Sequence, residues 1–188
     1  MDIDSTINII QKACDEFINK NIDDILIQIK NNKSIINNNY NEVNISNIDK
    51  KTWGVYAFYI IPQTNISTFK ELNKLWKTNL KNKRLHSPAV IQNKFKPLMA
   101  NYPTCIYVGK SEDLASRIKQ HIHQETKYTT YGLKISEHDR LHLENSFEYS
   151  YFIIKNNPSD GIKDGMRCLL TTLERTLREK LNPLIGKQ

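Results

Sequence analysis

The run GVYAFYII at residues 54–61 is the feature that most restricts how this chain can fold. It is uninterrupted by polar residues, is rich in aromatic and β-branched side chains, and is followed at once by Pro62. A short run of this kind is typical of a buried strand. TCIYVG (104–109) and SFEYSYFIIK (146–155) have the same character, so the sequence predicts three strands.

Helical patterns follow the second and the third of these strands. LASRIKQHI comes after Ser111, which we expect to be the N-cap, and Gly109 is expected to turn the strand into this helix. MRCLLTTLERTLREKL (166–181) has leucines at helical spacing and is ended by Asn182-Pro183. The order strand, insert, strand, helix, strand, helix predicts an α+β fold.

Residues 1–53 contain neither glycine nor proline, so nothing forces a turn there. Isoleucines recur at steps of three and four from Ile3 to Ile29, which predicts one or two amphipathic helices. Their apolar stripe fits either packing on the core of the same chain or a dimer interface. The Asn-rich segment 31–47 is predicted to be loop.

The segment between the first two strands, residues 62–103, carries the main concentration of positive charge. Thr68 and Glu71 form a capping-box pattern that predicts a helix through ELNKLWKTNLKNK. The basic face of this segment is either a solvated helix surface or a contact surface for nucleic acid. The candidate contacts to DNA are Lys74, Lys77, Lys81 and Arg84.

Composition narrows the class of partner. The 188 residues suit a single domain, and the net charge of +7 favours polyanionic partners, nucleic acid before an anionic membrane. No apolar run approaches the roughly 20 residues that span a bilayer. The first residues lack the positive region of a signal peptide, and three separated cysteines form no disulfide framework. We therefore expect a cytoplasmic protein without a membrane partner.

Two tripeptides and three single residues occur in one order along the chain. They are Gly54-Val55-Tyr56, Tyr107-Val108-Gly109, Arg117, His121 and Glu174. Each alone has an ordinary structural explanation, since strand tyrosines usually pack in a core and an i,i+4 pair often faces solvent. As an ordered set on these predicted elements they resemble the GIY-YIG nuclease family, with one Ile-to-Val change in each tripeptide.

This resemblance implies a small three-stranded, mostly antiparallel sheet flanked by helices over residues 53–188. Residues 1–52 would form an N-terminal helical extension that the family pattern does not cover. Family members often join the two tripeptides by a short connection, whereas here the helical insert 62–103 separates them. Large inserts at this point occur in some restriction endonucleases of the family.

The resemblance also implies the roles of the site residues. Tyr56, Tyr107, Arg117, His121 and Glu174 would be catalytic, with Glu174 the ligand of one Mg²⁺, for which Mn²⁺ could substitute. Arg117 can present its guanidinium fork to phosphate oxygens, and Lys110 can add a second cationic contact. The general base is either Tyr56, as the resemblance suggests, or His121, whose ordinary pKa suits neutral pH better.

The sequence thus predicts a divalent-metal-dependent endonuclease that cleaves double-stranded DNA, most like the stand-alone, sequence-specific restriction enzymes. A homodimer would pair two cuts, and the N-terminal helical stripe is a candidate interface. Two alternatives remain open: a repair or homing-type nuclease that nicks one strand, and a non-catalytic DNA-binding protein on the same scaffold.

Overall fold

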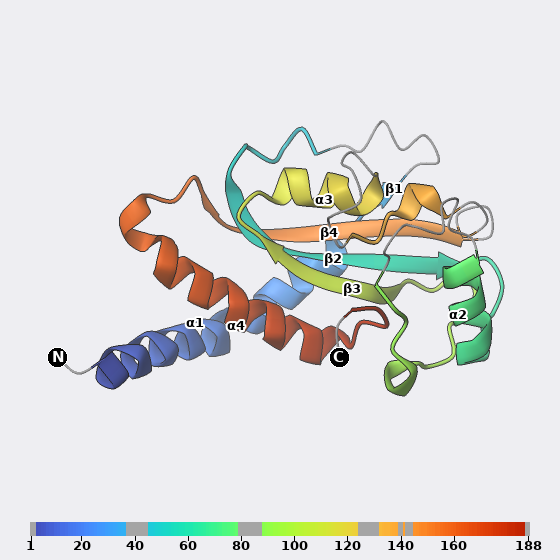
Figure 1. Cartoon of the computed structure of the whole chain (residues 1–188), viewed down its shortest axis with the longest axis horizontal. Coiled ribbons are helices and arrows are strands. Elements are labelled where there is room, and N and C mark those ends of the chain that lie inside the picture. The colour runs from blue at the N-terminus through green and yellow to red at the C-terminus, as the bar shows by residue number, and fades with distance from the viewer. Residues whose placement is uncertain are drawn as a thin grey trace.

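The computed structural model has an α+β architecture in which helices flank one antiparallel sheet (Figure 1). It describes residues 3–36, 45–78, 88–123, 132–138, 141 and 145–186. The strands are β1 (Ser34–Ile36), β2 (Thr52–Pro62), β3 (Thr104–Ser111) and β4 (Asn145–Asn156). The α-helices are α1 (Ile3–Asn31), α2 (Phe69–Thr78), α3 (Leu114–Ile122) and α4 (Lys163–Leu181), and the short 3₁₀ helices are η2 (Gln92–Lys94), η3 (Ile135–Glu137) and η4 (Asp160–Ile162).

The sheet has four strands in the order β1-β4-β2-β3, and each neighbouring pair is antiparallel. The α+β class with flanking helices is confirmed, but the prediction of three strands is wrong by one strand. The additional strand, β1, lies in the segment predicted as loop and pairs with residues 147–149 of β4. Its three residues are too few to show a periodic pattern, so the free edge of β4 decides that they become a strand.

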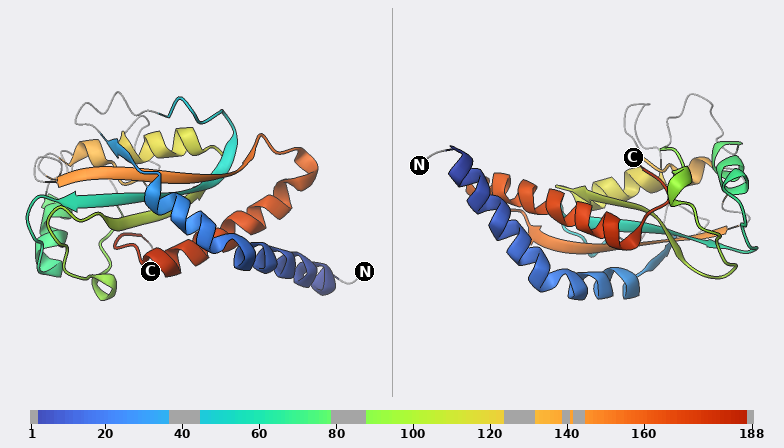
Figure 2. Two further views of the ribbon diagram at one scale, coloured as in Figure 1. Left: turned by 180° about the vertical axis from the view of Figure 1, so that it is seen from behind. Right: turned by 90° about the horizontal axis from the view of Figure 1, so that it is seen from below.

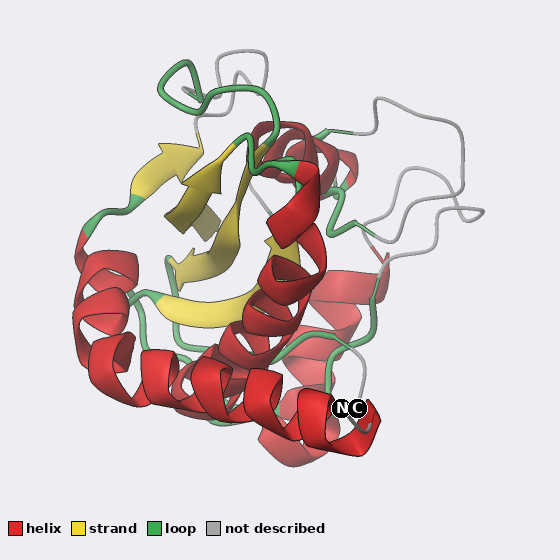
Figure 3. Ribbon diagram, turned by 90° about the vertical axis from the view of Figure 1, so that its left-hand side faces the viewer, coloured by secondary structure: helices red, strands yellow, loops and turns green. Residues whose placement is uncertain are grey.

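The two faces of the sheet carry two separate hydrophobic clusters. Tyr56 and Phe58 of β2 belong to the cluster that includes α3, whereas Val55 and Ala57 belong to the cluster that includes α1 and α4. Figure 3 shows the helices on both sides of the sheet. A strand covered on both faces needs apolar side chains at every position, which explains the unbroken run at residues 54–61.

The N-terminal isoleucine pattern forms a single long helix, α1, whose two halves differ in their surroundings (Figure 2). In its second half Ile22, Ile25 and Ile29 are at most 9% exposed and pack with α4 and the sheet. The core-packing interpretation is therefore confirmed for this half. The first half extends past the sheet, and Ile7 and Ile9 there are more than half exposed. For that half the dimer interface stays a prediction.

The insert 62–103 begins as its sequence predicts. The backbone N–H of Glu71 donates to Thr68 Oγ1 at 3.2 Å and Thr68 N–H donates to Glu71 Oε2 at 3.0 Å, so the capping box at the start of α2 is confirmed. A pair of backbone hydrogen bonds between Ile66 and Leu98 closes the described part of the insert on itself. Figure 1 shows α2 at the end of the sheet where β2 ends.

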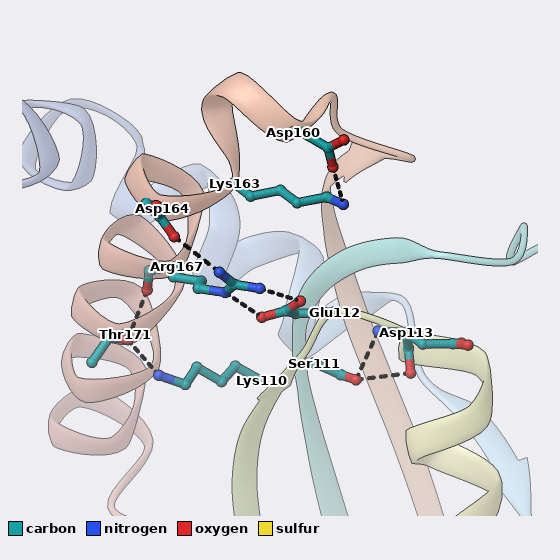
Figure 4. Close-up of polar contacts among 9 residues, drawn as sticks. All are labelled: Lys110, Ser111, Glu112, Asp113, Asp160, Lys163, Asp164, Arg167 and Thr171. Atoms are coloured by element: carbon teal, nitrogen blue, oxygen red, sulfur yellow. Dashed lines mark hydrogen bonds and ion pairs between the residues drawn. The ribbon is translucent and has the colours of Figure 1, made fainter.

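Helix α3 begins later than expected, because β3 continues through Ser111. The N-cap is Asp113, whose carboxylate accepts from Ser116 N–H at 3.1 Å, and the prediction of Ser111 as the cap is wrong. The Ser111 hydroxyl instead accepts from Asp113 N–H at 2.9 Å and shapes the turn (Figure 4). Gly109 therefore lies within the strand and does not end it.

Within the described ranges, none of the helices combines the length and the apolar character that crossing a bilayer requires. The three cysteines are free thiols. Cys14 of α1 and Cys168 of α4 lie side by side, with their sulfur atoms 3.5 Å apart.

A candidate active site at the edge of the sheet

The predicted site residues lie around β3, which is one of the two edge strands of the sheet. Tyr56 comes from the neighbouring strand β2, Arg117 and His121 come from α3 on one face, and Glu174 comes from α4 on the other face. An edge strand is the one place where side chains from both faces can approach each other without a further strand between them. Segments far apart in sequence therefore converge here.

Gly109 makes this convergence sterically feasible. It is paired directly with Tyr56 in the β2–β3 register, and the tyrosine ring lies where a side chain at position 109 would be. A Cβ on Gly109 would stand 2.6 Å from Cζ of Tyr56 and 3.0 Å from Cε1 of Tyr107. The second tripeptide therefore needs its glycine to make room for the Tyr56 ring, and not to turn the chain.

Three aromatic rings, those of Tyr56, Tyr107 and His121, pack together next to Gly109. Tyr56 stacks on Tyr107 with ring centroids 6.2 Å apart, and the His121 ring lies 5.2 Å from Tyr56 and 4.7 Å from Tyr107. Tyr56 and His121 are essentially inaccessible to solvent, at 1% and 0% exposure. Packing on three sides fixes the direction in which the Tyr56 hydroxyl points.

Both ring nitrogens of His121 are hydrogen-bonded. The backbone N–H of Leu133 donates to Nδ1 at 3.1 Å, so Nδ1 carries no proton. Nε2 lies 2.9 Å from the Tyr56 hydroxyl oxygen. Burial first, and then the positive charge of Arg117, lowers the pKa of His121 well below its ordinary value. In the neutral ring the proton must therefore sit on Nε2, which donates to the Tyr56 oxygen.

Arg117 lies one helical turn before His121 and is held by a hydrogen bond of 3.0 Å to Gln120 Oε1. Burial raises the pKa of the Tyr56 phenol above its ordinary range, with smaller contributions in the same direction from Tyr107 and Glu174. The charge of Arg117 and its hydrogen bond to Tyr56 act in the opposite direction. Tyr56 therefore interacts electrostatically with three of the four other predicted catalytic residues.

Glu174 projects from the middle of α4 and is held by two cations. Its carboxylate oxygens lie 3.8 Å from Lys110 Nζ and 3.7 Å from the guanidinium of Arg178. The Lys110 ammonium also donates to Thr171 Oγ1, which fixes it between β3 and α4 (Figure 4). The Glu174 side chain is 20% exposed, so the carboxylate remains accessible from outside.

Two hollows lie along α4, and Glu174 lines one of them. One, of about 530 Å³, is lined by Glu174 together with the cationic side chains of Lys94, Arg175 and Arg178. Because Lys94 belongs to η2, the insert contributes to the wall of the hollow that contains Glu174. The other, of about 440 Å³, lies beside Lys110. Glu179 also lines the first hollow, so its three cations face two carboxylates.

The exposed ion pair between Arg167 and Glu112 closes one end of the second hollow (Figure 4). Two hydrogen bonds, of 2.7 and 3.2 Å, join the guanidinium to the carboxylate, and Arg167 also pairs with Asp164 at 2.9 Å. The bond to Arg167 holds the pKa of Glu112 below its ordinary value. The pair links the turn before α3 to α4, the two elements that carry the site.

A divalent cation at Glu174 stays a prediction, since in this structure the carboxylate is ion-paired with Lys110 and Arg178. No group of three or more His, Cys, Asp or Glu side chains comes together among the residues that the structure describes, so a site made wholly of protein ligands is not present there. Mg²⁺ commonly binds through one or two carboxylates, with waters and substrate phosphates completing its shell. A single accessible carboxylate beside cations that can bind phosphate has this character.

The predicted DNA-binding lysines of the insert lie elsewhere. Lys74 and Lys77 are on α2, at the end of the sheet where β2 ends (Figure 1). Gly109 lies near the opposite end of β3, so these lysines are at a distance from the predicted catalytic residues along the sheet. Lys81 and Arg84 lie outside the described residues.

Some residues that matter here were missed by the sequence analysis. His138, which the family pattern does not include, is fully buried, while His123 is partly buried and His142 is outside the described part of the chain. Arg178 could have been found from its i,i+4 spacing to Glu174. Leu133 acts through its backbone N–H, for which the sequence carries no signal.

Comparison with known proteins adds no relative: no family model, no curated protein and no solved structure matches this chain.

Proposed function

We propose that this chain is a divalent-metal-dependent endonuclease that hydrolyses phosphodiester bonds in double-stranded DNA, of the GIY-YIG type and most like its restriction enzymes. The observation that carries the proposal is the convergence of Tyr56, Tyr107, Arg117 and His121 with Glu174 across the edge strand β3. The sequence pattern selects these five residues, and they come from four separate elements.

The cations of the cleft suit a phosphodiester group. Arg117 can direct two parallel N–H groups at the non-bridging oxygens, a planar match that lysine lacks. Lys110 stands beside Glu174 and can move from the carboxylate to a phosphate at little cost, since both partners are oxyanions. Lys94 and Arg175 line the same cleft and would bind the backbone on one side of the scissile phosphate.

Glu174 would hold the Mg²⁺ or Mn²⁺ ion. When bound, such an ion polarises the phosphoryl oxygen and stabilises the charge that develops on the leaving oxygen. Without it Glu174 raises the pKa of Tyr56, so neutralising this carboxylate favours the deprotonated phenol. Either the Tyr56 oxygen or a nitrogen of His121 would take the proton from the attacking water.

The remaining parts of the proposal concern the whole protein. The exposed apolar residues in the first half of α1 are the candidate surface for a homodimer, which would let two sites cut the two strands. We place the enzyme in the cytoplasm, where its thiols would stay reduced.

The test is incubation of the purified protein with supercoiled plasmid and with a long linear DNA, each in Mg²⁺ and in chelator. Discrete fragments that require Mg²⁺ are the expected result. Nicked circles alone would favour the repair or homing-type alternative. Intact DNA under all conditions, with binding retained, would instead identify a non-catalytic DNA-binding protein.

Variants connect the activity to the site. Arg117→Ala and Glu174→Ala should each lower the cleavage rate by roughly 10²-fold or more while leaving DNA binding detectable. Glu16→Gln, an exposed carboxylate on α1 away from the cleft, is the control and should cleave normally. Full activity in either of the first two variants would contradict the proposed site.

A further inference from the structure

His138 lies behind the candidate site and is fully buried. Its Nε2 is 3.1 Å from the carbonyl oxygen of Leu133, so this nitrogen must carry a proton and donate it to the carbonyl. The same residue, Leu133, donates its backbone N–H to Nδ1 of His121. The backbone of Leu133 therefore contacts both buried histidines, His138 through its carbonyl and His121 through its N–H.

The hydrogen bonds run in one direction through this connection. His138 donates to the carbonyl of Leu133, Leu133 donates to His121, and His121 donates through Nε2–H to the oxygen of Tyr56. If Tyr56 donated to His121 instead, the proton of the neutral ring would have to sit on Nδ1. Nδ1–H would then face the N–H of Leu133, with two donors opposed and no acceptor between them. The geometry therefore allows one neutral tautomer of His121.

The loop that carries Leu133 is fixed tightly against α3. A Cβ on Gly132 would stand 2.7 Å from the carbonyl oxygen of Gln120, so only glycine permits this approach without a backbone shift. Lys134 follows in the left-handed conformation with φ of 55°, which is unfavourable for a residue with a side chain. Strained backbone of this kind persists where its surroundings dictate it.

The insert also contacts this chain of hydrogen bonds. The ring of Trp76 in α2 lies on the ring of His138, with centroids 4.4 Å apart and an interplanar angle of 35°. Trp76 is itself 2% exposed and donates its indole N–H to the carbonyl of Pro88 at 2.8 Å. The orientation of His138 is thereby set by α2, the helix that carries the basic face.

We propose that His138 is a positioning residue that acts through the backbone of Leu133 to hold His121 as a hydrogen-bond donor to Tyr56. His121 then has no free nitrogen lone pair with which to accept a proton from water. Of the two candidate bases this leaves Tyr56, which the family resemblance already suggests, and His121 would stabilise its deprotonated oxygen. This assignment of the base rests on the proposed function, whereas the tautomer of His121 does not.

The tautomer is measured directly by ¹⁵N NMR of the histidine ring nitrogens in the full-length protein without metal or DNA, with His121→Gln used to assign the signals. The expected wild-type result is a protonated Nε2 and an unprotonated Nδ1 on His121. His138→Met, which removes the donor but keeps much of the volume, should give a mixture of the two tautomers. His138→Gln keeps an N–H at the position of Nε2 and should restore the single tautomer.

Activity supplies the second readout. His138→Met should slow single-turnover cleavage by about 10-fold or more with unchanged DNA affinity, and His138→Gln should recover most of the rate. Gly132→Ala disturbs the same connection without replacing either histidine. It should behave like His138→Met and takes its place as the test if His138→Met folds poorly. His123→Gln is the control for substitution of a histidine in itself.

A proton on Nδ1 of His121 in the wild type, or an unaltered tautomer in both His138→Met and Gly132→Ala, would overturn the inference. If the wild type cleaves no DNA, the proposed function fails, and the NMR result alone still decides how His121 is held.

Discussion

At the scale of single residues, the candidate site depends on two glycines as much as on the predicted catalytic side chains. Gly109 leaves room for the ring of Tyr56, and Gly132 lets the Leu133 loop approach α3. Glycine is needed at both positions because a Cβ would come too close to neighbouring atoms. Neither glycine has a left-handed backbone conformation. The geometry of the candidate site is thus set partly by backbone-to-ring and backbone-to-backbone contacts.

Gly109→Ala should therefore disable the site. The added methyl group would contact the Tyr56 ring and should displace it, at a cost of roughly 1–3 kcal/mol in the free energy of unfolding and about 10²-fold or more in cleavage rate. Chemical denaturation and single-turnover cleavage measure the two effects.

Gly165→Ala in α4 is the control, because no atom lies within 4 Å of its added Cβ. It should be neutral or slightly stabilising and fully active. Equal behaviour of the two alanine variants would show that Tyr56 does not need the space at Gly109.

His121 should make the stability of the fold depend on pH. Its folded-state pKa is lowered by burial and by Arg117, so below about pH 6.5 the unfolded chain binds a proton that the folded chain does not. Its contribution is complete above that pH and is lost as the pH falls, by up to about 1.4 kcal/mol per pH unit.

Urea unfolding of the wild type and His121→Gln across this range isolates the contribution, since all other groups are common to both proteins. The difference between their unfolding free energies should shrink on acidification. Two parallel curves would mean that His121 titrates in the folded protein as it does in the unfolded chain.

The residue types of the site could be predicted from the sequence, but their interactions could not. The i,i+4 spacing of Arg117 and His121 places them on one face of a helix, and the structure agrees. From the sequence alone, His121 could also have been the base. The contact that speaks against this is the Leu133 N–H at its Nδ1, and Leu133 lies in a loop with no recognisable sequence pattern. Burial of His138 was missed for the same reason.

At the scale of elements, long periodic segments were predicted well and short ones were not. α1, α4 and the three long strands follow from apolar patterns of ten residues or so, whose burial outweighs local preference. β1 was missed because three residues owe their conformation to the free edge of β4. The cap of α3 was misplaced from Asp113 to Ser111 because both residue types favour that position.

The second half of α1 should be part of the folding unit. Ile25 is 1% exposed and packs against the sheet and α4, so Ile25→Ala should cost about 2–5 kcal/mol in the free energy of unfolding. Ile9→Ala, at an exposed position of the same helix, should change stability by less than about 0.5 kcal/mol. Equal effects in denaturant titrations would show that α1 does not pack on the core.

At the scale of the whole molecule, two of the basic surfaces in the described part of the chain concern DNA binding: the cleft beside Glu174 and the basic face of α2. These surfaces are at a distance along the sheet, so one DNA duplex would have to reach both if each binds phosphate. Electrostatic binding of this kind weakens as the salt concentration rises, and the slope of that dependence reports how many phosphates the protein neutralises.

Replacing Lys74 and Lys77 with alanine should reduce that slope by about 0.9 for each phosphate that is no longer neutralised. Fluorescence anisotropy with a short duplex at several salt concentrations, in Ca²⁺ to prevent cleavage, gives the slope directly. A matched double variant at Lys12 and Lys20, both exposed on α1, should leave it unchanged. If both double variants show the same salt dependence of DNA binding, α2 is not part of the DNA-binding surface.

The central claim of the proposed function is that the Tyr56 hydroxyl takes part in DNA cleavage. Tyr56→Phe removes one oxygen and keeps the ring above Gly109, so folding and DNA affinity should be preserved. Single-turnover cleavage at saturating protein should then fall by about 10²-fold or more relative to the wild type. A phenylalanine variant that cleaves DNA at the wild-type rate would contradict the account.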